Sequence, residues 1–242
     1  NGDTLWTRTY GGAAIDVGYS VKQTFDGGYV LVGYTGSFGS GADDVYVIKT
    51  DANGDTTWTK TYGDGTYNYG YSIVQTADSG YAFTGEMDYW GADNAFLIRT
   101  DSMGDTLWTK TYGGGGFEGC WRVIQTMDGG YALAGWTSSF GAGDYDFLLI
   151  KTEAMGDTTW TRTYGGTGQD IGLSLVETPD TSYLISGYTF SFGTGGDAYG
   201  LAVDSMGSLL WSKVYGGTSG DAAYSMELKA DGVYVIGAYT YS

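Results

Sequence analysis

The stretch Gly2-Asp3-Thr4-Leu5-Trp6-Thr7-Arg8-Thr9-Tyr10-Gly11-Gly12 decides the fold, because the chain contains it five times. The later copies surround Trp58, Trp108, Trp160 and, in a more diverged form, Trp211. These tryptophans stand about fifty residues apart, and a fixed period of that size is the signature of a repeat architecture. The meaning of each local pattern therefore depends on its position in the repeat.

Each repeat contains four segments of β-strand composition and no helical pattern. In the first repeat they cover residues 5–10, 19–24, 29–35 and 44–50, with an Asp-Gly hairpin turn at residues 25–28. Four antiparallel strands in about fifty residues make one blade of a β-propeller. The sequence predicts an all-β chain that forms a single domain over residues 1–242, a five-bladed β-propeller of four-stranded antiparallel blades.

The repeat resembles the blades of kelch and PQQ-type propeller proteins, in a form typical of secreted bacterial repeat proteins. The likeness rests on a third strand that turns through Asp and Gly into a Trp-bearing strand, as in Asp51…Gly54…Trp58, Asp101…Gly104…Trp108 and Glu153…Gly156…Trp160. It covers nearly the whole chain. The paired glycines that end a kelch blade are absent, since Gly33, Gly85, Gly135, Gly187 and Gly237 stand alone. The resemblance implies that the strand at 19–24 is innermost and the tryptophan strand outermost.

The last blade lacks one strand. The sequence contains five inner hairpins and five tryptophan strands but only four third strands. The fifth blade therefore takes two strands from residues 224–239 and its outermost from residues 5–10, so that both termini share it. Three explanations stay open: a shortened chain, a three-stranded blade that rearranges slightly, or a strand of another molecule that enters the gap. An unfilled slot exposes unpaired N–H and C=O groups, which invite pairing with another chain.

The incomplete blade suggests how the protein could assemble. A contact in which each copy completes its neighbour is heterologous and need not close, so it builds a filament. No spare third strand exists in the chain, which leaves an existing strand, a rearranged terminus or a different protein as the donor. We expect the assembly edge to contain Trp6, Arg8, Tyr10, Tyr234, Ile236 and Tyr239.

Composition excludes several classes of function. The net charge of −17 repels nucleic acid phosphates and anionic membranes. The chain has no histidine, which removes the commonest general base and transition-metal ligand. The sequence contains no run of eighteen apolar residues that would predict a membrane span.

A chain that begins at Asn1 rather than Met fits either a processed mature protein or a shortened one. The composition predicts an extracellular protein, secreted or at the cell surface.

Two series of acidic and amide residues recur with the repeat. One precedes the inner strands and the other begins the third strands, and we expect both on one face of the propeller. Oxygens of this kind suit Ca²⁺, whereas loop capping by accepted backbone N–H bonds is the alternative. The candidate calcium ligands are Asp16, Asn68, Glu118, Asp170, Asp221, Asp44, Asn94, Asp146 and Asp197.

Aromatic residues at aligned positions suggest a second function. Rings at a loop-bearing face can stack on sugars, although packing between blades needs the same rings. The candidates for sugar stacking are Tyr34, Trp90, Trp136 and Tyr188. Each basic residue that stands two after a tryptophan is expected to stack on aromatic rings or pair with acids. These residues are Arg8, Lys60, Lys110, Arg162 and Lys213.

No residue set predicts a reaction, because each polar cluster that the sequence suggests repeats with the blade whereas a catalytic cluster is unique. We expect no catalytic residues and no certain cofactor. The sequence favours a non-enzymatic extracellular scaffold that assembles with itself, or with another surface protein, through its incomplete blade. The alternative is a lectin with one shallow site per blade, with Ca²⁺ as a candidate cofactor and glycans as partners. Neither reading involves nucleic acid or membrane insertion.

Overall fold

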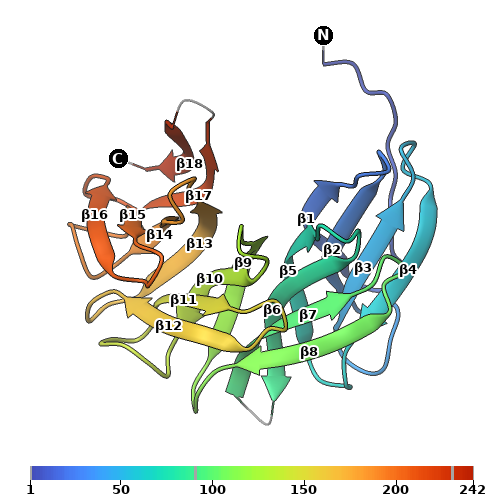
Figure 1. The fold of residues 1–242 in the computed structure, drawn as a ribbon, viewed down its shortest axis with the longest axis horizontal. Coiled ribbons are helices and arrows are strands. Elements are labelled where there is room, and N and C mark those ends of the chain that lie inside the picture. Colours follow the sequence, from blue (N-terminus) through green and yellow to red (C-terminus); the bar gives the residue numbers. More distant parts are fainter. Residues whose placement is uncertain (1, 90–91, 230–231, 242) are drawn as a thin grey trace. The chain divides into compact units, whose positions relative to one another are not determined.

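The computed structural model describes residues 2–89, 92–229 and 232–241, and within them the chain belongs to the all-β class, with strands joined by turns and loops (Figure 1). The chain divides into two compact units, Asn1–Thr111 and Tyr112–Ser242, and each is described by itself. Over the described ranges, no helix has the length and apolarity that crossing a bilayer requires.

The first unit holds two sheets. Sheet 1 has strand order β1-β2-β3-β4 and sheet 2 has the order β5-β6-β7-β8. The strands are β1 (Asp16–Gln23), β2 (Tyr29–Thr35), β3 (Asp44–Thr50), β4 (Thr56–Tyr62), β5 (Asn68–Gln75), β6 (Tyr81–Tyr89), β7 (Ala92–Thr100) and β8 (Thr106–Tyr112).

The second unit holds two further four-stranded sheets and one smaller sheet. Sheet 3 has the order β9-β10-β11-β12, sheet 4 has β13-β14-β15-β16, and sheet 5 has only β17-β18. The strands are β9 (Glu118–Gln125), β10 (Tyr131–Thr137), β11 (Asp146–Thr152), β12 (Thr158–Tyr164), β13 (Asp170–Glu177), β14 (Tyr183–Thr189), β15 (Asp197–Val203), β16 (Leu209–Tyr215), β17 (Asp221–Leu228) and β18 (Tyr234–Thr240).

These sheets confirm the predicted repeat of four antiparallel strands in each of the first four repeats. The third strands β3, β11 and β15 are buried at every residue. The outermost strands instead alternate between exposed threonines and half-buried residues, as in β4 and β8. This is the pattern of a strand that covers one side of a core and meets water on the other.

Neighbouring sheets of a unit pack face to face through alternate side chains. In unit 1, Val45 and Val47 of β3 share a core with Phe83, Phe96 and Ile98 of sheet 2. In unit 2, Phe147 and Leu149 of β11 share a core with Ile185, Tyr199 and Leu201 of sheet 4. Strand β15 contributes Tyr199 and Leu201 to the core with the preceding sheet 3, and Ala202 to a cluster with Met226 and Ile236 of the next sheet.

The predicted strand at residues 5–10 is wrong as secondary structure. Residues 2–12 form no strand, because no neighbouring strand pairs with them (Figure 1). The segment nevertheless lies against sheet 1 through side chains, since the Trp6 and Tyr29 rings meet edge to face at 5.8 Å between centroids. Trp58 of β4 meets Tyr81 of sheet 2 in the same way at 5.7 Å. Segment 2–12 thus occupies the place of an outermost strand without having a partner strand.

Candidate functional site

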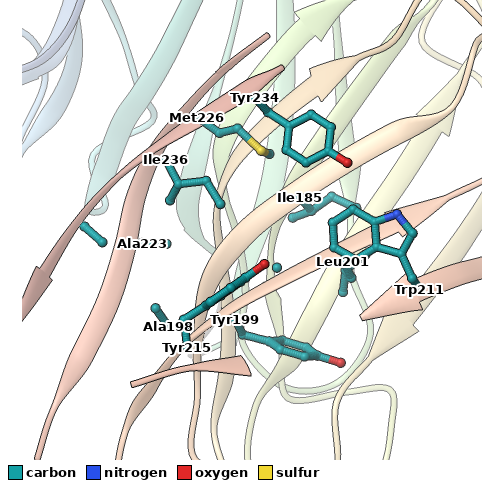
Figure 2. Close-up of a pocket in the computed structure, with 12 residues that line it drawn as sticks. Ile185, Ala198, Tyr199, Leu201, Trp211, Tyr215, Ala223, Met226, Tyr234 and Ile236 are labelled. Atoms are coloured by element: carbon teal, nitrogen blue, oxygen red, sulfur yellow. The ribbon is translucent and has the colours of Figure 1, made fainter. Parts of the chain in front are cut away.

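The most distinctive feature of unit 2 is a cavity of about 390 Å³ beside sheet 5 (Figure 2). Its walls come from β14, β15 and β16 of sheet 4 and from β17 and β18 of sheet 5. Figure 2 shows the rings of Trp211, Tyr215 and Tyr234 around it, together with Met226 and Ile236. The lining is therefore apolar and aromatic, as in ligand or peptide sites.

Comparison of sheet 4 and sheet 5 with the other repeats gives two reasons for the cavity. In sheet 3, β11 presents Phe147 and Leu149 to the next sheet. The residues at the same places in β15 are Ala198 and Gly200, and both line the cavity. Within the residues that the structure describes, sheet 5 also has no third strand, whereas in sheet 4 that strand supplies Tyr199 and Leu201 to the core. Small residues on one wall and a missing strand on the other leave the space unfilled.

Strand β18 is the exposed edge of sheet 5. Its residues are exposed except Ile236, whereas the matching strand β14 is buried at six of seven positions. Tyr234, Ile236 and Ala238 face the cavity. Tyr239 points elsewhere, since its ring packs with Tyr224 at 5.7 Å. Of the predicted assembly edge, Tyr234 and Ile236 thus line the cavity and Tyr239 lies on the other side of β18.

The remaining members of the predicted edge lie in unit 1 on segment 2–12. Arg8 forms an ion pair of 3.0 Å with Asp55, and its guanidinium lies 5.9 Å from the centroid of the Trp6 ring. The Tyr10 hydroxyl donates a hydrogen bond of 2.7 Å to the Gly54 carbonyl oxygen. These contacts dock the segment on sheet 1.

The two acidic series cap loops. Asp16 accepts the Gly12 N–H at 2.8 Å, and Glu118 accepts the Gly114 N–H at 2.7 Å. The residues at the starts of the third strands also accept a backbone N–H, from a residue three or four places earlier in the chain. Asp146, for example, accepts the Ala142 N–H at 2.8 Å. Matching bonds are made by Asp44, Asp170, Asp197 and Asp221. The structure therefore gives these residues the capping role that was the alternative to calcium.

Members of the two series also approach one another in unit 2. Asp146 and Asp170 both lie against Gly165, and Asp197 and Asp221 both lie against Gly216, so closely that a Cβ on either glycine would collide with both carboxylates. Burial raises the pKa of Asp146, and the charge of Asp170 raises it further. Asn68 belongs to the same pattern, beside Asp44 at Gly63. The described residues contain no group of three or more acidic or cysteine side chains around one point.

The aromatic series makes ring contacts. Tyr34 meets Tyr69 edge to face at 4.9 Å, Trp136 lies 5.6 Å from Trp121, and Tyr188 lies 5.9 Å from Phe190. These three side chains are half-buried. Trp90 itself lies outside the described residues. Ring packing thus accounts for each described member.

The prediction for the basic residues is confirmed where contacts are described. Lys60 pairs with Asp105 at 2.8 Å, and the charged groups of Arg162 and Lys213 lie over the Trp160 and Trp211 rings. These cations stabilise the scaffold rather than form a separate ligand patch.

One polar pair breaks the repeat, and the sequence reasoning missed it. Glu86 stands where the other repeats carry Tyr34, Trp136 and Tyr188, and its Oε1 accepts a hydrogen bond of 2.6 Å from the Tyr71 hydroxyl. Burial raises the pKa of Glu86, and burial with the Glu86 charge raises that of Tyr71. The signal in the sequence was a carboxylate at a position that is aromatic in these other repeats.

A second cavity, of about 580 Å³, lies in unit 1 between the turns of sheets 1 and 2. Trp58 and Tyr81 border it together with Asp26, Lys49 and Gln75. It therefore combines aromatic rings with charged and amide groups.

Comparison with known proteins identifies the fold but no family. No protein-family profile and no curated protein matches the sequence. Among solved structures, puromycin hydrolase is similar with a TM-score of 0.56 and 13% identity, over 91% of this chain and 35% of that one. Sqt1 from Chaetomium thermophilum has a TM-score of 0.52 and 14% identity, over 85% of this chain and 48% of that one. The chain thus spans half or less of these structures. At such identities the likeness concerns the fold alone, which is β-propeller-like.

Proposed function

We propose that the protein is a non-enzymatic extracellular interaction scaffold that assembles through its incomplete last blade. The five repeats correspond to five blades of kelch or PQQ-like type. The last blade combines β17 and β18 with segment 2–12 and lacks its third strand. Assembly with further copies gives a filament or surface polymer, and another surface protein is the other class of partner.

The observation that carries this proposal is the edge of β18. Four sheets have four strands, whereas sheet 5 has two, with an exposed edge and an unfilled apolar cavity beside it. An exposed strand edge offers a row of backbone donors and acceptors, and proteins normally cover or charge such edges. Here Tyr234, Val235 and Tyr239 are 41%, 51% and 41% exposed. Apolar exposure of this kind marks an interaction surface.

Segment 2–12 supports the same proposal from the other end of the chain. It makes the side-chain contacts of an outermost strand but has no strand beside it. A strand placed between β18 and this segment would satisfy both. The charge of −17 suits a soluble extracellular chain and favours partners that are neutral or basic at the contact.

The test compares the oligomeric state of the wild-type chain with that of Ile236→Lys. A charge that points into the cavity protects an edge against pairing. Light scattering and negative-stain microscopy should show concentration-dependent assemblies for the wild type and monomers for the variant. Leu107→Lys is the matched control, because Leu107 lies exposed on the outer strand β8. A wild-type chain that stays monomeric at high concentration and captures no surface protein would refute the proposal.

A carbohydrate-binding role is the second candidate, and the cavity beside Trp58 and Tyr81 favours it. Sugar sites commonly combine an aromatic face with a few polar groups, and Asp26, Lys49 and Gln75 supply those groups here. A glycan array tests it. Binding that falls in Trp58→Ala but not in Trp211→Ala would support a lectin, and no binding at any glycan density would remove it.

A further inference from the structure

We propose that the unit 1 cavity binds an uncharged saccharide and that the hydroxyl of Ser79 is one of the groups that contact it. This cavity is the one of about 580 Å³ that Trp58 and Tyr81 border, and all its lining residues belong to unit 1. The inference rests on the carbohydrate-binding role, the second candidate above. It names the class of sugar and a residue that holds it.

Ser79 breaks the repeat at a backbone position that favours glycine. It stands in the turn between β5 and β6 with φ at 69°, in the left-handed region. The same turn position is glycine in sheets 1, 3 and 5, where Gly27, Gly129 and Gly232 have φ of 83°, 85° and 82°. A side chain strains the backbone in this region, whereas glycine does not. The serine is therefore unfavourable for the turn itself.

The hydroxyl of Ser79 has no hydrogen-bond partner in the part of the chain that the structure describes. The other non-glycine residue with a left-handed backbone in that part is Thr181, at the same turn position in sheet 4. The Thr181 hydroxyl donates a hydrogen bond of 2.6 Å to the Asp180 carbonyl oxygen. Ser79 is instead exposed and lines the cavity. Strained residues gather at ligand sites, so we assign its hydroxyl to a ligand.

Gln75 fixes the backbone of Ser79 beside the cavity. Its Oε1 accepts the Phe25 N–H at 2.8 Å, and its Nε2 donates to the Ser79 carbonyl oxygen at 3.3 Å. One side chain thus joins the β1-β2 turn to the β5-β6 turn, and both turns line the cavity. A hydroxyl that is presented from a fixed backbone loses little freedom when a ligand binds.

The charges that line the cavity cancel. The Lys49 ammonium donates to both carboxylate oxygens of Asp26, at 2.8 and 3.1 Å, and to the Thr50 carbonyl oxygen at 2.7 Å. These bonds use all its N–H donors. The Asp26 side chain is 63% exposed, so its carboxylate can still accept a bond from a ligand hydroxyl. The wall therefore suits an uncharged polar ligand, and the net charge of −17 repels acidic sugars.

The aromatic side of the cavity suits the C–H face of a sugar ring. The Trp58 and Tyr81 rings meet edge to face at 5.7 Å between centroids. Tyr81 is buried, whereas Trp58 is half-buried and keeps part of its ring open to the cavity. A pyranose can pack its apolar face on such a ring while its hydroxyls reach Ser79 and Asp26. Sites for small organic ligands combine these two kinds of surface.

The binding test uses arrays of neutral and of uronic acid oligosaccharides, followed by calorimetry with the neutral oligosaccharide of strongest signal. Ser79→Gly should weaken its binding about fivefold, because one hydrogen bond to the ligand is lost. Ser79→Thr keeps the hydroxyl and should bind like the wild type, since Thr181 shows that this turn admits threonine. Thr181→Gly is the matched control and should leave binding unchanged.

Thermal unfolding separates contact with a ligand from a role in the fold. Ser79→Gly should melt at the wild-type temperature or above it, because glycine relieves the strained turn. A lower melting temperature would assign the hydroxyl to the fold and overturn the proposal.

The binding results distinguish failure of this inference from failure of the carbohydrate-binding role. Equal binding by the wild type and Ser79→Gly, with a loss in Trp58→Ala, would leave the role standing and remove Ser79 from the site. A preference for uronic acid oligosaccharides would contradict an uncharged ligand. Absence of binding to every oligosaccharide would refute the role and the inference together.

Discussion

The hydroxyl of Tyr10 donates a hydrogen bond of 2.7 Å to the carbonyl oxygen of Gly54, although the segment that carries Tyr10 belongs to no sheet. The same bond joins Tyr62 to Gly104, Tyr112 to Gly156 and Tyr164 to Gly207, at 2.6 to 2.8 Å. Each tyrosine lies at the end of the tryptophan-bearing strand of its repeat or, for Tyr10, in segment 2–12. Each glycine lies in the turn before the tryptophan-bearing strand of the next repeat. The contact between successive repeats is thus built by side chains and persists where the strand ladder is lost.

This relationship makes a prediction about Tyr215, the fifth tyrosine of the series. It is 50% exposed, and a last blade shared by the two termini would give it Gly2 as its partner. If segment 2–12 completes the last blade, Tyr215→Phe and Tyr164→Phe should each lower the free energy of unfolding by about 1 kcal/mol, because each would remove one hydrogen bond. Urea unfolding measures both. A loss for Tyr164→Phe with no change for Tyr215→Phe would contradict a last blade shared by the two termini.

Gly187 tests the register of the inner hairpins. A Cβ there would overlap the Ile171 carbonyl oxygen, as it would at Gly33, Gly85 and Gly135 against their own partner strands. Gly187→Ala should therefore lower the free energy of unfolding by about 2 kcal/mol, since the backbone must move to admit the methyl group. Ala238 holds the same place in sheet 5, and Ala238→Gly should change it by less than about 1 kcal/mol. Thermal unfolding of both variants checks this, and a neutral Gly187→Ala would refute the register argument.

The Asp26–Lys49 pair predicts a specific dependence on pH. The hydrogen bond from Lys49, with that from Thr24, lowers the pKa of Asp26 to about 2. A carboxylate with a depressed folded pKa stabilises the fold above its unfolded pKa of 3.8, and this contribution is lost as the pH falls toward 2. The stability difference between wild type and Asp26→Asn should thus be largest near neutral pH and shrink between these values.

Asp180 is the control for that series, because Ala202 replaces the lysine in its sheet. Asp180→Asn should cost less at neutral pH, since its main donors are the Thr178 hydroxyl and the Ser182 N–H. Unfolding followed across the pH range compares the two. Equal losses of stability in the two variants would show that the ion pair with Lys49 adds nothing to the stabilisation that Asp26 provides.

Asp146 should behave in the opposite sense. Burial, with the charge of Asp170, raises its pKa, so stability falls as the pH rises above the unfolded pKa of 3.8, and the loss is complete once the pH exceeds the folded pKa. Asp146→Asn should therefore raise the melting temperature near pH 7, and the gain should vanish near pH 3. Asp204→Asn is the control with the reverse sign, because backbone hydrogen bonds lower the pKa of Asp204.

The same variant examines the calcium hypothesis. A cation bound only to the folded state raises stability. Ca²⁺ between Asp146 and Asp170 would raise the melting temperature of the wild type and not that of Asp146→Asn. Identical melting in calcium and in chelator would leave loop capping as the role of both residues.

The repeat predicted the strands well because its signals are local. Alternation around Trp58 and the turn at Asp26 depend on residues a few places apart, and both appear as expected. The missing third strand of sheet 5 followed from counting. Segment 2–12 failed as a strand because a strand requires a partner, which its own sequence does not supply.

The site was harder to predict, because it depends on contacts between sheets. The cavity arises from the substitution of two core residues by Ala198 and Gly200, and their consequence shows only when β16 and β18 are placed around them. Gly237 looked like the fifth member of the lone-glycine series, yet the pairing puts Ala238 in that place. The pairing of Glu86 with Tyr71 was not predicted, because the two residues lie on neighbouring strands.

Hydrogen exchange at the amides of β18 tests the central claim most directly. We predict that alternate amides of Tyr234–Thr240, those directed away from β17, exchange quickly in the chain alone, whereas the matching amides of Tyr183–Thr189 in β14 are protected. Equal protection of the two strands would contradict an open edge on β18.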